Sequence, residues 1–270
     1  GGRTRVYSGN PEKGSEEASW EAPLLLNPLD HMKVYHFSDE MFEGANFGRE
    51  WTLKGSPVLG QIIDAAIAEN NDKIIAIARY TALNLTTDGG NTWKNIVSGL
   101  PSYYITDIAF DPKRDSTILV TYNRYQSDNK KVYISKDLGS TWTNISYNLN
   151  NMPLRTVVVD QSDSSYIYVG GEIGVYYKSM NGTQWTLYDN KMPNVTVKDL
   201  EIHHGSNTLR AATWGRGLWE YTLVGKNDHP SITTTEISHI PHEESPKVGN
   251  PQFVTCNIET EAGLKSAKVY

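Results

Sequence analysis

The chain contains the octet Thr86-Thr87-Asp88-Gly89-Gly90-Asn91-Thr92-Trp93, and its pattern returns as Ser135-Lys136-Asp137-Leu138-Gly139-Ser140-Thr141-Trp142. A shorter copy, Ser179-Met180-Asn181-Gly182-Thr183-Gln184-Trp185, has Asn in place of Asp, and a fainter one precedes them at Asn46-Phe47-Gly48-Arg49-Glu50-Trp51. Successive copies are about 40–50 residues apart, a period typical of stacked or radial arrays of small structural units. The sequence therefore predicts a repeat architecture.

Each copy suits a tight turn between two strands. An Asp carboxylate accepts hydrogen bonds from backbone N–H groups within a turn, and Gly adopts backbone angles that a side chain disfavours. The Trp opens the next strand and offers a large apolar face to a neighbouring unit. Because these positions recur, we assign the following residues to the scaffold: Asp88, Gly90, Trp93, Asp137, Gly139, Trp142, Asn181 and Trp185.

The octets resemble the Asp-box, or BNR repeat, of sialidases, xyloglucanase-type glycosidases, sortilin-like receptors and many bacterial surface proteins. The resemblance spans residues 20–224 and implies an all-β fold, a β-propeller of four-stranded blades. Short strand-like runs between turn signals agree with it. They place the blades at about 21–55, 56–99, 100–149, 150–191 and 192–224. The fifth blade has three predicted strands and ends in Trp214-Gly215-Arg216-Gly217-Leu218-Trp219, which is similar to the closing strand of many BNR propellers.

Two arrangements of these blades are open. In one, Arg5–Ser8 supplies the missing strand of the last blade, which closes a five-bladed ring and removes an open sheet edge. In the other, which the usual size in the family favours, the blades are the later part of a seven- or eight-bladed ring. Residues 225–250 lack periodicity and are predicted to be a linker. Residues 251–270 alternate like the first hairpin of an immunoglobulin-like sandwich, which is truncated here.

The composition argues against several functional classes. A net charge of −6 and a pI near 5.7 argue against a nucleic-acid partner, and no apolar run reaches transmembrane length. The single Cys256 excludes an internal disulfide. No His/Cys cluster has metal-ligand spacing, and no phosphate-binding glycine motif follows a strand, so we expect no metal and no cofactor. Gly1-Gly2 does not resemble a natural start, and neighbouring domains of a longer polypeptide are expected.

Recurrence separates scaffold from candidate site. Asp64, Asp107 and Asp199, with Thr156 at the equivalent place, recur at the start of the inner strands and are assigned to the scaffold. Residues that do not recur lie in loops between second and third strands or between blades, which share one face of a propeller around its channel. The candidate ligand-binding residues are Arg79, Tyr80, Tyr103, Tyr104, Arg124, Tyr125, Glu172, Trp214 and Arg216. Aromatic rings beside Arg and carboxylates suit sugar rings or peptide segments.

Tests for known chemistry mostly fail. A sialidase needs three Arg around a carboxylate, a Tyr nucleophile with a Glu partner and an Asp acid, and its Arg-Ile-Pro motif does not occur here. Xyloglucanase-type enzymes use two Asp residues across a cleft between two propellers, and this chain holds one propeller at most. Glycoside hydrolysis requires two carboxylates about 5–10 Å apart, which the sequence cannot assign to any pair. No catalytic residue is therefore named.

The sequence favours a binding role over an enzymatic one. The resemblance implies an extracellular or bacterial cell-surface protein, similar to large secreted proteins of Bacteroidota. We expect a non-catalytic module that binds a glycan or an extracellular protein or peptide. Two alternatives stay open: a fragment of a xyloglucanase- or sialidase-like glycoside hydrolase, and an architectural module of a large adhesin.

Overall fold

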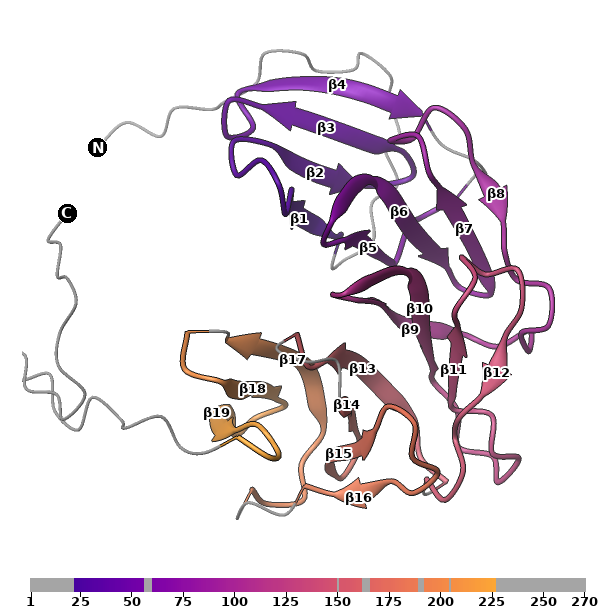
Figure 1. The fold of residues 1–270 in the computed structure, drawn as a ribbon, viewed down its shortest axis with the longest axis vertical. Coiled ribbons are helices and arrows are strands. Elements are labelled where there is room, and N and C mark those ends of the chain that lie inside the picture. The colour runs from indigo at the N-terminus through magenta and orange to yellow at the C-terminus, as the bar shows by residue number, and fades with distance from the viewer. Residues whose placement is uncertain are drawn as a thin grey trace, which may run out of the picture. The chain divides into compact units, whose positions relative to one another are not determined.

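The computed structural model describes residues 22–55, 60–149, 151–161, 166–188, 192–203 and 205–226. The chain divides into two compact units, Gly1–Leu223 and Val224–Tyr270. All described strands belong to the first unit, and every regular element within the described residues is a strand (Figure 1). The predicted all-β class is confirmed.

The strands form antiparallel sheets in which neighbours along the chain are neighbours in space. Four sheets have four strands and the fifth has three, as the sequence predicts. The first is β1 (Leu24–Leu26), β2 (Val34–Phe37), β3 (Met41–Ala45) and β4 (Glu50–Gly55); the second is β5 (Asp64–Ala68), β6 (Asn71–Arg79), β7 (Ala82–Thr86) and β8 (Lys94–Asn95). The third is β9 (Ile105–Asp111), β10 (Arg114–Tyr122), β11 (Val132–Ser135) and β12 (Thr143–Asn144). The fourth is β13 (Leu154–Val159), β14 (Tyr166–Gly171), β15 (Gly174–Ser179) and β16 (Thr186–Leu187), and the fifth is β17 (Val197–His203), β18 (Thr208–Thr213) and β19 (Gly217–Thr222).

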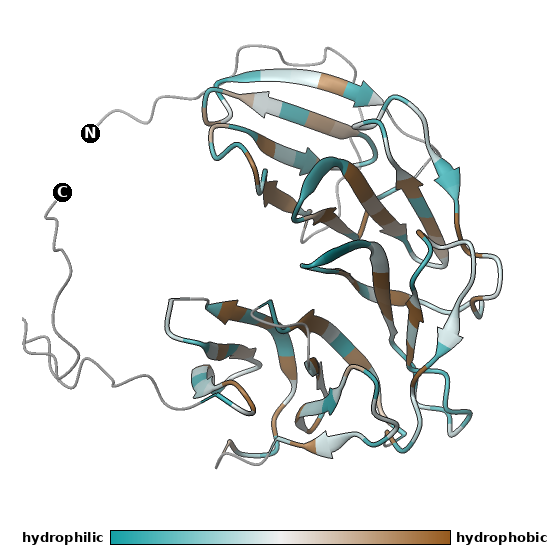
Figure 2. Cartoon of the chain, in the orientation of Figure 1, coloured by the Kyte–Doolittle hydropathy of each residue, from teal (hydrophilic) through white to brown (hydrophobic). Residues whose placement is uncertain are grey.

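The core lies between consecutive sheets. The first strand of each sheet packs beside the first strand of the next, so β1, β5, β9, β13 and β17 are successive neighbours. Ala76 and Ala78 of β6 pack against Ile105 and Ile108 of β9 in one apolar cluster. Because an interior sheet has a sheet on each side, its second strand is buried on both faces, as 117–122 of β10 show. The apolar residues of these strands are brown in Figure 2.

The two full Asp-boxes are closed by the same hydrogen bonds. Asp88 accepts hydrogen bonds from the Thr92 N–H (2.9 Å), the Thr92 hydroxyl (2.6 Å) and the Thr86 hydroxyl (2.8 Å), and the Gly90 N–H donates to that Thr86 hydroxyl. These donors lower the pKa of Asp88 to about 2. The second box repeats the set with Asp137, Thr141, Ser135 and Gly139. The predicted turn chemistry is thus present in both copies.

The repeat tryptophans join each blade to the one before it. The Trp142 indole N–H donates to the Ile96 carbonyl (2.8 Å), and the Trp185 indole N–H donates to the Ile145 carbonyl (2.8 Å). Trp93 packs against the apolar cluster between the first and second sheets, although its N–H bonds within its own turn, to Gly90. Trp185 is 3% exposed, whereas Trp93 and Trp142 are half-buried. The third copy of the repeat, residues 179–185, therefore holds the most buried of the three tryptophans.

In the third copy of the repeat, residues 179–185, a different group closes the turn. The buried Lys178 ammonium donates to the carbonyls of Ser179 (2.8 Å), Met180 (3.1 Å) and Gly182 (3.0 Å). Burial, with a smaller contribution from Lys136, lowers the pKa of Lys178 to about 8. In this turn an ammonium donates hydrogen bonds to three carbonyls. In the other two turns a carboxylate accepts hydrogen bonds instead. Sequence reasoning did not single out Lys178.

The remaining predictions about the chain ends stay predictions. In the part of the chain that the structure describes, β19 pairs with β18 alone. The proposed closing strand Arg5–Ser8 and the immunoglobulin-like hairpin within 251–270 lie outside the described residues, as does nearly all of the linker 225–250.

Candidate functional site

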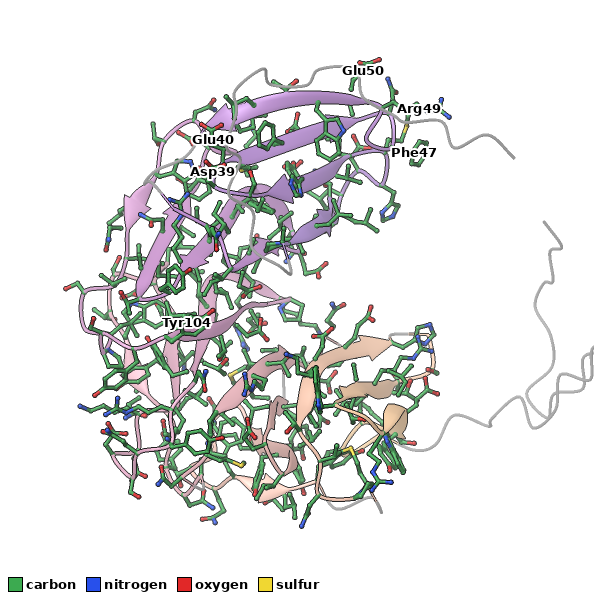
Figure 3. The ribbon with its side chains drawn as sticks, turned by 180° about the vertical axis from the view of Figure 1, so that it is seen from behind. Asp39, Glu40, Phe47, Arg49, Glu50 and Tyr104 are labelled. Carbon is green, nitrogen blue, oxygen red and sulfur yellow. The ribbon has the colours of Figure 1, made fainter. Side chains whose placement is uncertain are left out.

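The loops between second and third strands lie beside the starts of the following inner strands. The Ile62 N–H donates to the Ser38 carbonyl, and the Ile105 N–H donates to the Tyr80 carbonyl, both at 2.7 Å. Figure 3 shows Asp39, Glu40 and Tyr104 on one side of the unit, with Phe47, Arg49 and Glu50 at the other end of the first sheet. The turn at Asp39 and Glu40 and the segments of Tyr80 and Tyr104 therefore lie toward one edge, away from the turn that carries Phe47 and Arg49.

Tyr80 and Tyr104 form an exposed aromatic pair on this edge. Their ring centroids are 5.6 Å apart with an edge-to-face angle of 72°, and the residues are 51% and 40% exposed. Tyr80 is the first residue of the two-residue turn between Arg79 and Ala82, and its φ is 48°. That place in a hairpin turn with positive φ normally belongs to Gly, so the backbone holds this tyrosine in an unfavourable conformation.

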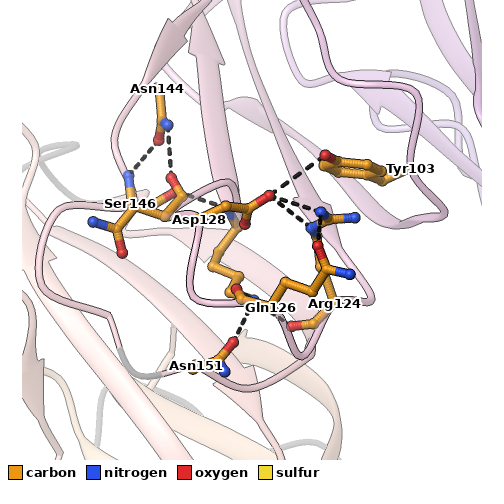
Figure 4. Close-up of polar contacts among 9 residues, drawn as sticks. Tyr103, Arg124, Gln126, Asp128, Asn144, Ser146 and Asn151 are labelled. Carbon is orange, nitrogen blue, oxygen red and sulfur yellow. Dashed lines mark hydrogen bonds and ion pairs between the residues drawn. The ribbon is translucent and has the colours of Figure 1, made fainter.

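A compact polar cluster supports the neighbouring loop (Figure 4). The Arg124 guanidinium lies 3.4 Å from the centroid of the Tyr103 ring and pairs with Asp128 at 2.8 Å. The buried Lys131 ammonium donates to the Gln126 carbonyl (2.9 Å) and to the carbonyl of Arg124. Burial lowers the pKa of Lys131, and the nearby Asp128 carboxylate opposes this. Arg124 and Tyr103 therefore fix the loop that carries the exposed Tyr125.

Arg79 is placed differently from its exposed neighbour Tyr80. Its side chain is buried and donates a 2.7 Å hydrogen bond to the Asp39 carbonyl. Burial lowers the pKa of the guanidinium, while the Asp39 carboxylate acts in the opposite direction. Arg79 thus connects the turn between β2 and β3 to the second sheet. Its side chain is buried, whereas that of Tyr80 is exposed.

Other candidates gather on the fourth and fifth sheets. Glu172 accepts hydrogen bonds from Arg155 (2.7 Å) and from the Thr196 hydroxyl (3.4 Å). Trp214 is 72% exposed, its backbone N–H donates to the Thr196 carbonyl, and the Lys198 ammonium lies 5.6 Å from its ring centroid. Arg216 is exposed, and its carbonyl accepts the indole N–H of Trp219. The candidates therefore form two groups, one on the second and third sheets and one on the fourth and fifth.

The inner-strand carboxylates connect consecutive blades. Asp64 accepts the Ile108 N–H and Asp107 accepts the Val157 N–H, both at 2.6 Å. The Thr156 hydroxyl accepts the Leu200 N–H at 3.3 Å. Each acceptor thus bonds the inner strand of the next sheet, which supports the scaffold interpretation.

Asp64 and Asp107 also bond to each other. Burial, followed by the charge of Asp107, raises the pKa of Asp64 well above its usual value. Burial raises the pKa of Asp107 to about 7, although hydrogen bonds with Val157, Thr156 and Asp64 act to lower it. Two carboxyl groups in contact share a proton, because like charges so close cannot both ionise readily.

A hollow lies at the opposite ends of the inner strands. Its volume is about 360 Å³, and residues of β5, β9, β13 and β17 line it, among them Ile67, Phe110 and Ile202. Glu69, Gln161 and Glu201 provide its polar groups, and the Gln161 amide donates to Glu69 at 3.3 Å. Sequence reasoning did not assign this hollow, because its residues belong to the inner strands and the turns that follow them, whereas the sequence candidates lie in other loops.

Within the described ranges, no group of three or more His, Cys, Asp or Glu side chains is arranged to hold a metal ion. Among those same residues, no helix is long and apolar enough to cross a membrane.

Comparison with known proteins agrees with the fold. The family model described as "Sortilin, neurotensin receptor 3" matches residues 39–169. A GH74 enzyme of Niastella koreensis aligns with a TM-score of 0.60 at 20% identity, over 73% of this chain and 35% of that one. The GH74 xyloglucanase of Xanthomonas campestris aligns with a TM-score of 0.58 at 14% identity, over 80% and 38%.

A third solved structure is an extracellular domain. It belongs to a putative hybrid two-component system of B. thetaiotaomicron and aligns with a TM-score of 0.59 at 13% identity, over 84% of this chain and 29% of that one. No curated protein matches the sequence. The chain is an array of Asp-box β-propeller blades, with sortilin-like repeats. It spans about a third of the length of the solved structures that it resembles.

Proposed function

We propose that this chain is a non-catalytic binding module of an extracellular or cell-surface bacterial protein, and that it holds a glycan at the Tyr80–Tyr104 edge. The observation that carries the proposal is the exposed pair of tyrosines, Tyr80 and Tyr104. Aromatic rings that stand out of a rigid scaffold provide flat apolar faces with a polar tip, which suits the apolar face and hydroxyl rim of a sugar ring.

The loops beneath this edge are held by side-chain contacts. Arg124, Tyr103 and Asp128 hold one loop together, and Arg79 anchors the adjacent turn through Asp39. Binding surfaces that are already ordered lose less conformational entropy when a ligand binds. Tyr125 and Trp214 add exposed rings in loops of the same kind, so a long ligand has further places to stack.

The chemistry near the site supports binding rather than hydrolysis. Glu172 is paired with Arg155, and the Asp64–Asp107 pair is engaged in contacts between blades. The similar Xanthomonas campestris structure is a xyloglucanase, so xyloglucan oligosaccharides are the first probe to use. The runner-up, a glycoside hydrolase fragment, rests on that likeness of fold alone.

The test is calorimetric titration of the chain with xyloglucan oligosaccharides. Tyr104→Ala is expected to weaken binding by about 1–3 kcal/mol, as loss of an aromatic anchor does, with an unchanged melting temperature. Phe47→Ala is the matched control, because Phe47 is also an exposed aromatic side chain but lies at the other end of the first sheet. Equal affinities of Tyr104→Ala and wild type would reject the site.

A second readout separates the two functions. Release of reducing ends from the same oligosaccharides is measured in parallel, and none is expected above the rate without protein. Release that depends on the chain would favour the hydrolase.

A further inference from the structure

The third copy of the repeat connects β15 to β16 and is one residue shorter than the two full Asp-boxes. When the copies are aligned at their first and last residues, Asn181 corresponds to Asp137 of the second box. Gly182 then corresponds to Gly139, and no residue takes the place of Leu138. In the second box, Leu138 packs against the apolar cluster between the second and third sheets. The third copy therefore lacks a side chain that fills space at the equivalent joint.

The contacts of the two turns differ accordingly. Gly139 lies against Ile96, because a Cβ placed on this glycine would be 2.6 Å from the Ile96 side chain. The atoms nearest to a Cβ placed on Gly182 belong to Ser179 of its own turn, at 3.4 Å. Ile145 is the counterpart of Ile96, since each carbonyl accepts the indole N–H of the next repeat tryptophan. The short turn thus leaves space beside Ile145 that the second box fills beside Ile96.

A pocket of about 350 Å³ lies at this place, between the outer strands of the third sheet and the turn of the third copy. We call it the short-turn pocket. Its apolar lining is formed by Ile134, Ile145 and Met180, with Gly182. Its polar lining is formed by Lys136, Thr141, Thr143, Tyr147 and Asn181. The volume falls within the range of roughly 300–1,000 Å³ that is usual for small-molecule sites.

Most of the polar groups in the short-turn pocket are free to contact a ligand. Four exposed groups make no hydrogen bond or ion pair with any described residue: the side chains of Lys136, Thr143 and Asn181, and the hydroxyl of Tyr147. In a full box the carboxylate is occupied by its own turn, as Asp137 is. Lys178 closes the third copy instead, so the Asn181 amide is not needed there.

The charge of the short-turn pocket is positive. Among the described residues that line it, Lys136 is charged and none carries a carboxylate. The buried Lys178 ammonium lies 5.9 Å from the centroid of the Tyr147 ring, and Lys136 is close enough to act, after burial, in lowering the pKa of Lys178. Asp137 in the adjoining turn accepts three hydrogen bonds from that turn. The pocket therefore suits a ligand with a negative charge.

We propose that the short-turn pocket binds a sugar acid, a single sugar ring that carries a carboxylate. The Lys136 ammonium pairs with the carboxylate, a charge-assisted contact of the stronger kind. The Thr143 hydroxyl and the Asn181 amide bond the ring hydroxyls, and the Tyr147 side chain offers an apolar face with a polar tip. These residues belong to other segments than Tyr80 and Tyr104, so this site and the proposed glycan edge can fail separately.

Titration of the ¹⁵N-labelled chain with sodium glucuronate, followed by NMR, tests the proposal. The amide signals of 141–147 and 180–182 are expected to shift and to saturate. Glucose and sodium acetate are titrated in parallel, because glucose lacks the carboxylate and acetate lacks the sugar ring. Each is expected to bind at least about tenfold more weakly than glucuronate, since each forfeits hydrogen bonds that include or accompany the charged contact.

A pair of lysine variants locates the charge. Lys136→Gln is expected to weaken glucuronate binding about tenfold, as loss of a hydrogen bond to a charged group does. Lys94→Gln is the matched control, because Lys94 is an exposed lysine on β8, the strand of the second sheet that corresponds to β12. It is expected to bind glucuronate as wild type does. Tyr147→Phe keeps the ring and removes the hydroxyl, and weaker binding is expected.

Four results would overturn the proposal. Acetate that binds as tightly as glucuronate would mean that the pocket recognises an anion alone. Glucose that binds as tightly would mean that the charge has no part in recognition. An equal loss of affinity in Lys136→Gln and Lys94→Gln would indicate general attraction to a charged surface. Glucuronate that leaves the signals of 141–147 and 180–182 in place would show that the pocket does not bind it.

Discussion

The Asp64–Asp107 pair predicts that the protein loses stability as pH rises. In an unfolded chain the Asp107 carboxyl titrates near 3.8, whereas burial in the folded state raises its pKa to about 7. Between these values the folded chain binds more protons than the unfolded chain. The contribution of the pair is therefore fully present below pH 3.8 and is lost as pH rises through 7.

The substitution Asp107→Asn isolates this effect. An amide oxygen still accepts the Val157 N–H, and the amide NH₂ can donate to Asp64, so the link between blades is preserved without a second ionisable carboxyl. The difference between 3.8 and about 7 corresponds to about 4 kcal/mol. We expect wild type to lose about 2.5 kcal/mol of this between pH 5 and 8, because the rest is lost below pH 5, and we expect Asp107→Asn to lose less.

Urea unfolding followed by tryptophan fluorescence at intervals from pH 5 to 8 measures both slopes. Asp137→Asn is the control: hydrogen bonds from Thr141 and Ser135 lower the pKa of Asp137 to about 2, so its carboxyl stays ionised throughout this range and the slope should match wild type. Parallel slopes for wild type and Asp107→Asn would refute the shared-proton account.

Two further predictions concern the scaffold. Trp185→Ala should destabilise by about 3–5 kcal/mol, as truncation of a buried aromatic does, and more than Trp142→Ala, because Trp185 is buried and Trp142 is half-buried; thermal melts that rank the two in reverse would contradict this. Lys178→Met should cost about 1–3 kcal/mol by removing the donor for three carbonyls, whereas Lys136→Met should be close to neutral in the same urea titration.

Much of the fold was predictable because its signals are local and repeated. The Asp-box turn is closed by residues within a few positions of one another, such as Asp88 with Thr92, so a short window of sequence contains the whole motif. The third copy shows where this fails. Its turn is closed by Lys178, and a lysine in an apolar run gives no sign that its ammonium will meet three carbonyls.

The candidate site was only partly predictable. Recurrence proposed the loops, but it could not tell an exposed side chain from one that supports its neighbours. Tyr104 is exposed, whereas Arg79 is buried against Asp39 and Arg124 is stacked on Tyr103. These differences depend on contacts between residues far apart in the sequence, and no residue pattern within a single loop encodes them.

Amide hydrogen exchange with and without xyloglucan oligosaccharide tests the binding account most directly. Bound ligand is expected to slow exchange in the segments around Tyr80 and Tyr104 and in the loop 123–131. The Asp-box turns, 86–93 and 135–142, should be unchanged. Slower exchange confined to the strand ends around the hollow lined by Ile67 and Phe110, or to the Asp-box turns, would contradict the proposed binding edge.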